Sequence, residues 1–181
     1  MIFLIASLVS AVFIGVTLVH VFFPLRKRGA FLLKISLGTG LGLGITSCVL
    51  FFSLFIFGPR FALVPEIVLV IMALVAWMFM IKKGVPAEVN LSPAGREKFK
   101  YGHILAVVFG ISLLSFPVSF AVSVAQEPHG KWDAWLIWNM HARFIYRAGE
   151  HWQNYFHSGL SWTHPDYPLM LPLSIVRSWC Y

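Results

Sequence analysis

Four long apolar runs constrain the fold of this chain more than any other feature of its sequence. They extend approximately from Ile2 to Phe23, Ile35 to Phe57, Pro65 to Ile81 and Ile104 to Ala125. A helix needs ~20 apolar residues to cross the roughly 30 Å hydrocarbon layer of a bilayer, and each run has that length or nearly so. Hydrophobic residues make up 59% of the chain and charged residues only 12%, which is far from the balance of a soluble domain. The sequence therefore predicts an all-α polytopic membrane protein.

Basic residues are concentrated in two of the connections between these runs. Four of them follow the first run and five lie between the third and fourth, whereas the short second connection carries only Arg60. Loops rich in Lys and Arg usually stay in the cytoplasm, so the amino terminus and the residues after the fourth run are predicted to be extracytoplasmic. The net charge of +7 comes mostly from these loops and would attract anionic lipids, so it is no indication of nucleic-acid binding.

The same runs divide the chain into parts. We expect a four-span region over residues 1–126, an extracytoplasmic loop over residues 127–166 and the start of a fifth, incomplete span over residues 167–181. The last run would make only about 22 Å of helix, which is too short to cross a bilayer. We therefore expect either that the chain is the amino-terminal part of a longer protein or that its end is re-entrant.

Glycine recurs at every second position near the start of the second run. Gly38, Gly40, Gly42 and Gly44 give small-xxx-small spacing twice, on adjacent helix faces. Such spacing lets helix backbones approach one another closely in a membrane. It predicts close packing of the second span against a neighbour.

The segment from His129 to Pro172 is dense in polar and aromatic residues, unlike the rest of the chain. It holds both aspartates of the protein, five of its seven histidines and five of its seven tryptophans. Neither solubility nor bilayer insertion requires that mixture, whereas a site at the membrane surface for a charged, ring-shaped substrate would. We therefore expect the functional site in this segment.

Residues 131 to 147 have helical periodicity, with one stripe formed by Trp132, Trp135, Asn139, Arg143 and Arg147. An amphipathic helix lying flat in the membrane interface, with tryptophans at the level of the lipid headgroups, fits this pattern. Two guanidinium groups one turn apart could converge on a phosphate. The alternatives are contacts with lipid phosphates and, for Arg147, an ion pair with Glu150.

Asp133 is the candidate general base. Trp132 and Trp135 give it a locally apolar setting, which favours the protonated carboxyl and so makes the carboxylate a better base for an acceptor hydroxyl. An interfacial aspartate that caps the flat helix explains the position equally well. His164 and Asp166 are a candidate pair for contacting substrate, or the aspartate stabilises a turn.

Histidines raise the question of a metal or a haem. The histidines at positions 129, 141, 151, 157 and 164 lack the HxxxH or HExxH spacing that places two imidazoles on one helical face, so no fixed metal site is predicted and a divalent metal is kept as an alternative. His20 and His103 lie near the cytoplasmic ends of their spans and could face each other across a haem. Interfacial positions are the more ordinary interpretation of both.

Two stretches of the polar segment, GKWDAWLIWNMHARF and HPDYPLMLPL, resemble the GT-C superfamily of polytopic glycosyltransferases. The likeness is to the bacterial branch similar to dolichyl-phosphate-mannose protein mannosyltransferases and lipid A aminoarabinose transferases. Members use a polyprenyl-phosphate sugar and carry an essential acidic residue in the first large extracytoplasmic loop. The resemblance covers about 45 residues, and the four spans match only as hydrophobic helices.

The resemblance implies a glycosyltransferase of the bacterial inner membrane, in a GT-C-like fold larger than this chain. Asp133 matches the acidic residue of the loop, and the segment before the next helix is matched by His164, Pro165, Tyr167 and Pro168. Three spans precede the one that leads into the loop, where well-known members have a single one. No second acidic residue adjoins Asp133, so metal dependence is left open.

The implied reaction moves a sugar from a polyprenyl phosphate to an acceptor hydroxyl with inversion. The departing phosphate needs cations and the acceptor needs a base, which are the roles expected of Arg143 or Arg147 and of Asp133. Trp132, Trp135 and Tyr167 would pack against the sugar or the prenyl chain. Further substrate contacts are expected from Asn139, His164 and Asp166. A non-enzymatic assembly or lipid-binding protein and a haem-binding electron-transfer subunit are the competing classes.

Overall fold

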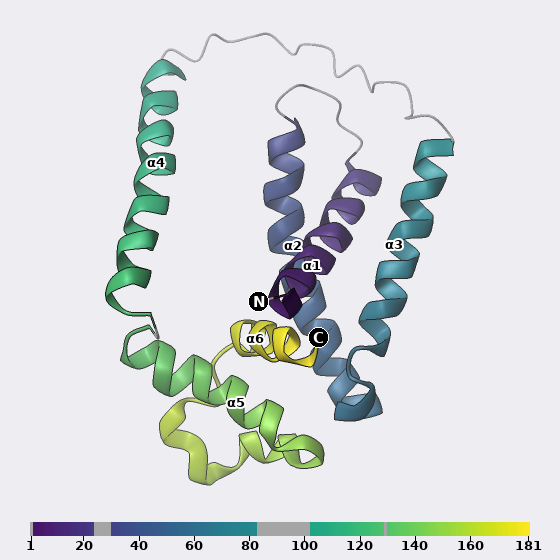
Figure 1. The fold of residues 1–181 in the computed structure, drawn as a ribbon, viewed down its shortest axis with the longest axis vertical. Coiled ribbons are helices and arrows are strands. Elements are labelled where there is room, and N and C mark those ends of the chain that lie inside the picture. Colours follow the sequence, from purple (N-terminus) through teal and green to yellow (C-terminus); the bar gives the residue numbers. More distant parts are fainter. Residues whose placement is uncertain (1, 24–29, 83–101, 129) are drawn as a thin grey trace. The chain divides into compact units, whose positions relative to one another are not determined.

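The computed structural model describes residues 2–23, 30–82, 102–128 and 130–181 (Figure 1). Every regular element in these ranges is helical, which confirms the predicted all-α class. The chain forms two compact units, one made of Met1–Glu88 with Leu136–Tyr181 and the other of Val89–Trp135. The basic residues at positions 26–28 and 83–100, on which the predicted orientation depends, lie outside the described ranges.

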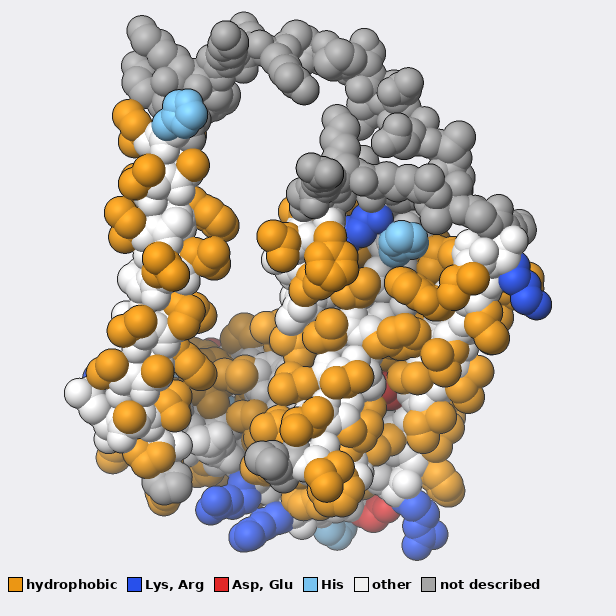
Figure 2. Space-filling model, turned by 45° about the horizontal axis from the view of Figure 1, so that its top comes forward, with side chains coloured by type: hydrophobic (Ala, Val, Ile, Leu, Met, Phe, Trp, Pro, Cys, Tyr) orange, Lys and Arg blue, Asp and Glu red, His pale blue; other side chains and the backbone are white. Residues whose placement is uncertain are grey.

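In the described part of the chain, four helices are long and apolar enough to cross a membrane, which confirms the four predicted spans. They are α1 (Ile2–Phe22), α2 (Ala30–Phe57), α3 (Val64–Lys82) and α4 (Gly102–Gln126). Figure 2 shows hydrophobic side chains along the lengths of the helices. Outward-facing apolar side chains suit contact with lipid because they lose no hydration there. The backbone of a helix suits lipid as well, because its interior N–H and C=O groups are hydrogen-bonded to one another.

Glycines bring the backbones of α1 and α2 into contact. A Cβ atom added to Gly15 would collide with backbone atoms of Gly38 and Gly42, so no side chain larger than hydrogen fits there. Close packing is thus confirmed for Gly38 and Gly42. A Cβ added to Gly40 or Gly44 would meet no described atom within 4 Å, so the second glycine face is not used in this way.

The chain reverses between α2 and α3 at Gly58. This residue has φ +74°, a left-handed conformation that glycine adopts without strain, and the short 3₁₀ element η1 (Pro59–Phe61) follows. Ala62, just after η1, is buried in the core described below. The turn therefore also packs against α5, η3 and α6, the helices defined below.

After α4 the chain continues as short helices. They are the π-helix η2 (Ala134–Asn139), α5 (Met140–Arg147), the 3₁₀ elements η3 (Gly149–Phe156) and η4 (Ser158–Thr163), and α6 (Met170–Cys180). The predicted helix over residues 131–147 is confirmed from Trp132 onward. Its π-helical stretch was not predicted, and it shifts the side-chain spacing away from the expected i, i+3, i+4 stripe.

A compact core holds α5, η3 and α6 against the end of α2 and the turn after it. Its buried members are Leu50, Leu54, Ala62, Ala142, Ile145, Trp152, Tyr155, Leu173 and Val176. The Trp152 ring meets Phe51 and Phe55 edge-on, with both centroid distances at 5.9 Å. Within this unit the layer lies at the end of the bundle where α1 begins (Figure 1). The predicted orientation puts the amino terminus and residues 127–166 on one side of the membrane, so it requires the layer and the start of α1 to lie at the same end of this unit.

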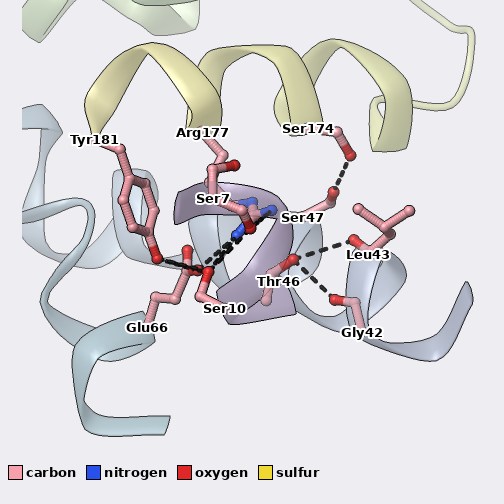
Figure 3. A network of polar contacts seen from close by, with 10 residues as sticks. All are labelled: Ser7, Ser10, Gly42, Leu43, Thr46, Ser47, Glu66, Ser174, Arg177 and Tyr181. Atoms are coloured by element: carbon pink, nitrogen blue, oxygen red, sulfur yellow. Dashed lines mark hydrogen bonds and ion pairs between the residues drawn. The ribbon is translucent and has the colours of Figure 1, made fainter. Parts of the chain in front are cut away.

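Helix α6 runs crosswise over α1 and α2 (Figures 1 and 3). Its 11 residues make about 16 Å of helix, less than a membrane span needs. Near its start, the hydroxyls of Ser174 and Ser47 lie 2.8 Å apart and tie α6 to α2. Residues 170–180 therefore form a short helix packed on the bundle, and the expected fifth span stays a prediction.

Candidate functional site

The exposed face of α5 carries a pair of arginines beside an apolar depression. Arg143 and Arg147 line a shallow hollow of about 390 Å³ together with Met140, Phe144 and Ala148. The opposite face of α5 is buried in the core, so the helix is held with its arginines outward. A cationic rim around an apolar floor matches a ligand that joins a phosphate to a hydrocarbon.

The ion pair between Arg147 and Glu150, the alternative interpretation, is not formed. Among the described residues, the ion pairs are His164 with Asp166 and Arg177 with Glu66. Within their own unit, Arg143 and Arg147 are therefore not neutralised by a carboxylate. Their guanidinium donors are available to an anionic ligand.

His164, Asp166 and Tyr167 lie together, as expected from their sequence proximity. The His164 and Tyr167 rings stack at a centroid distance of 4.8 Å and an angle of 17°, and Trp138 lies 5.8 Å from Tyr167. His164 Nδ1 is 4.0 Å from Asp166 Oδ1, and both side chains are exposed, so this pair contributes little to stability. The exposed His164 and Tyr167 rings and the half-buried Trp138 ring form an aromatic surface beside polar groups.

His141 is a buried structural residue rather than one member of a metal site. The Thr163 hydroxyl donates to the Leu160 carbonyl, so it accepts a hydrogen bond from His141 Nε2 at 3.1 Å. His141 Nδ1 then accepts from the Tyr155 hydroxyl at 2.9 Å. In this assignment the imidazole is neutral, and the chain of hydrogen bonds joins α5, η3 and η4.

Burial lowers the pKa of His141, opposed by a hydrogen bond to the Thr163 backbone and reinforced by His164. Burial likewise raises the pKa of Tyr155 to about 12, with a smaller contribution from Asp166, so its hydroxyl keeps its proton near neutral pH. Both groups are thus held in their uncharged forms. A charged imidazole would lose its acceptor at Nδ1, and the Tyr155 hydroxyl would then donate only to the Pro165 carbonyl, which lies 3.4 Å away.

We expect the first unit to lose stability as the pH falls below about 6.5, the ordinary pKa of histidine in an unfolded chain. Because the folded pKa of His141 is lowered, the unfolded state takes up the proton first, and the stabilising contribution is lost between the unfolded and folded values. Thermal unfolding in detergent at several pH values measures this loss. His141→Gln should flatten the profile and His151→Gln, at an exposed position, should not; a profile unchanged by His141→Gln would contradict the assignment.

Trp132, Asp133 and Trp135 belong to the other unit, Val89–Trp135. All three side chains are exposed, with Trp132 at 75% and Trp135 at 56% of their full accessibility. Asn139, half-buried at the end of η2, belongs to the first unit with the two arginines. The candidate residues are therefore divided between two units, and their convergence in one site stays a prediction.

No group of three or more His, Cys, Asp or Glu residues is arranged to hold a metal ion in the described ranges, which do not include His129. His20 lies beside Lys34, with 3.1 Å between Nδ1 and Nζ, and its ring is 5.6 Å from that of Trp77. His103 belongs to the other unit. The contacts of His20 thus suit an interfacial residue.

A buried cluster of charged and hydroxyl groups was not foreseen from the sequence (Figure 3). Glu66 in the first turn of α3 and Arg177 on α6 form an ion pair, with 2.6 Å between Oε1 and Nη1 and side chains that are 2% and 1% exposed. The Ser10 and Tyr181 hydroxyls donate to the same carboxylate oxygen at 2.8 and 2.7 Å. Arg177 Nη2 donates to the Ser7 carbonyl at 2.5 Å. The cluster thus joins α1, α3 and α6.

A signal for this pair was present in the sequence. Glu66 is the one charged residue of the apolar run over residues 65–81, and Arg177 is the one charged residue of residues 167–181. A charge inside an apolar helix is costly unless a partner of opposite sign lies beside it. Two such lone charges of opposite sign are candidates for pairing, and the packing of the helices decides whether they meet.

No protein-family model, no curated protein and no solved structure matches this chain. The likeness to GT-C glycosyltransferases therefore depends on the two quoted stretches of sequence alone.

Proposed function

We propose that this chain acts as a GT-C-type glycosyltransferase that moves a sugar from a polyprenyl phosphate to an acceptor hydroxyl. The observation that carries the proposal is the pair of arginines beside the apolar depression on α5. Their planar donors suit a phosphate, and the apolar floor suits the hydrocarbon next to it. In the proposed orientation, the amino terminus and residues 127–166 lie on the extracytoplasmic side of a bacterial inner membrane.

The reaction needs few groups from the protein. The acceptor oxygen attacks the anomeric carbon while the bond from that carbon to the phosphate oxygen breaks, and Asp133 takes the hydroxyl proton. Arg143 and Arg147 stabilise the charge that develops on the departing polyprenyl phosphate. This single displacement inverts the anomeric configuration. Contacts to the sugar are assigned to Trp132, Trp135, Asn139, His164, Asp166 and Tyr167.

Asp133→Asn should lower sugar transfer at least about 100-fold, which is the lower end of what a positioned base contributes. Membranes containing the full chain are given a panel of labelled polyprenyl-phosphate sugars, and the release of free polyprenyl phosphate is measured. Glu127→Gln is the matched control, because it neutralises another exposed carboxylate just after α4. Turnover that persists in Asp133→Asn removes the base assignment, and no release by the wild type with any donor contradicts the proposed reaction.

A lipid-binding or assembly protein without catalytic activity is the second candidate. It would use the same arginines, because they suit the phosphate of any membrane lipid. It differs in predicting that Asp133→Asn lowers the release of free polyprenyl phosphate no more than Glu127→Gln does. The comparison of these two variants therefore separates the candidates.

A further inference from the structure

A second hollow lies between α1, α5 and α6 of the first unit. It has a volume of about 650 Å³ and is lined by Phe3, Leu4, Tyr146, Ile175, Ser178 and Trp179. Among the described residues that line it, none carries a charge, and the polar groups are the hydroxyls of Ser178 and Tyr146 and the indole N–H of Trp179. A polar sugar or an ion would lose its hydration there without adequate partners, whereas a hydrocarbon would not. The lining therefore selects an apolar occupant.

This second hollow, called the groove from here on, opens at the end of a membrane span. Phe3 and Leu4 belong to the first turn of α1 and are 62% and 49% exposed. The Tyr146 and Trp179 rings meet edge-on at 5.6 Å on the facing helices. Tyrosine and tryptophan favour the boundary between headgroups and hydrocarbon. A lipid chain that enters the bilayer at this boundary would pass through the groove.

The buried cluster holds the walls of the groove in place. Arg177 lies between Ile175 and Ser178 on α6, and its guanidinium group binds Ser7 and Ser10 of α1. The Ser47 hydroxyl ties the first half of α6 to α2 through the Ser174 hydroxyl and the Met170 carbonyl. Walls that are already ordered lose little conformational entropy when a ligand binds, so the groove is suited to hold a flexible chain.

The groove shares helix α5 with the cationic depression. Tyr146 follows Arg143 by three residues, and residues at this spacing are neighbours on a helix surface. We propose that the groove holds the prenyl chain of the polyprenyl phosphate whose phosphate Arg143 and Arg147 bind. One groove takes one chain, which fits a single-chain prenyl lipid better than a phospholipid with two acyl chains. The inference rests on the proposed function and adds the place of the lipid chain.

A photoreactive polyprenyl phosphate with its reactive group in the prenyl chain tests the inference. It is added to the full chain in nanodiscs of phosphatidylcholine, and the labelled residues are mapped by mass spectrometry. We expect labelling at Phe3, Leu4 or Trp179, displaced by unlabelled polyprenyl phosphate but not by an equal amount of phosphatidylglycerol. Labelling elsewhere, or equal displacement by phosphatidylglycerol, would overturn the inference.

Filling the groove gives an independent test. Ser178→Trp places a large side chain in the hollow and should reduce labelling at least tenfold. Leu171→Trp is the matched control, because Leu171 is exposed on the same helix but does not line the groove. Replacing both Arg143 and Arg147 with glutamine should raise the lipid concentration for half-maximal labelling at least tenfold. Labelling that Ser178→Trp leaves unchanged would also count against the groove.

The two proposals fail in different ways. Asp133→Asn should keep groove labelling while losing transfer, because the carboxylate is not needed to hold the lipid chain. Turnover in Asp133→Asn with intact labelling would remove the assigned base and leave the groove. Transfer by the wild type without groove labelling would remove the groove and leave the reaction.

Discussion

Replacing Arg177 with methionine is expected to lower the free energy of unfolding by about 3–5 kcal/mol. Methionine fills a similar space, but Glu66 is then left as a buried carboxylate without its cation. Glu66 Oε2 has no hydrogen-bond partner among the described residues even in the intact cluster, so only Oε1 is solvated by protein groups. The Ser10 and Tyr181 hydroxyls alone cannot compensate a full charge at this depth.

Removing both charges should restore most of the lost stability. In Glu66→Leu with Arg177→Met, neither buried charge remains, and apolar replacement of a whole buried pair is often neutral or stabilising. Unfolding of the full chain in mixed micelles, followed by tryptophan fluorescence, measures these differences. Arg60→Met is the control, because Arg60 is exposed and should change stability by no more than about 0.5 kcal/mol. The assignment would be refuted if Arg177→Met were as stable as Arg60→Met. It would also be refuted if the double variant were no more stable than Arg177→Met alone.

Gly15→Ala is expected to destabilise the protein by about 1–3 kcal/mol, which is the usual effect of overpacking. The added methyl group would collide with backbone atoms of Gly38 and Gly42, which cannot move away by changing a rotamer. Helices α1 and α2 would have to separate, and the contacts along their shared interface would weaken. The same unfolding assay in mixed micelles detects this loss.

Two glycines of α2, the helix that Gly15 packs against, provide controls. An alanine side chain at Gly40 or Gly44 meets no described atom within 4 Å. Because glycine is a weak helix former, these substitutions should be neutral or stabilising by up to about 1 kcal/mol. Destabilisation of Gly40→Ala as large as that of Gly15→Ala would show that loss of glycine itself, rather than the close approach of the helices, causes the effect.

Most of the fold could be read from the sequence because it follows from local composition. The four spans were predictable since a bilayer requires about 20 apolar residues per helix whatever the packing. The helix that includes α5 was predictable from its amphipathic stripe, and the packing at Gly38 and Gly42 from their spacing. The π-helical stretch was not, because periodicity assumes 3.6 residues per turn throughout.

The candidate site was predictable only in part. The sequence placed Arg143 and Arg147 on one helix face, and the structure adds the apolar floor beside them. The sequence also placed His141 among possible metal ligands, whereas the structure buries His141 between Tyr155 and Thr163. Hydrogen-bond partners separated by 14 and 22 residues depend on how three short helices pack, which no local pattern specifies.

The sequence by itself determined that this is an all-helical membrane protein with four spans and a polar, aromatic segment after the fourth. Apolar run length decides those features, because lipid admits no unsatisfied backbone groups. Only the tertiary structure decided that α6 lies across α1 and α2 and that Glu66 meets Arg177. Partners 111 residues apart are selected by the three-dimensional packing that makes burial of both charges tolerable.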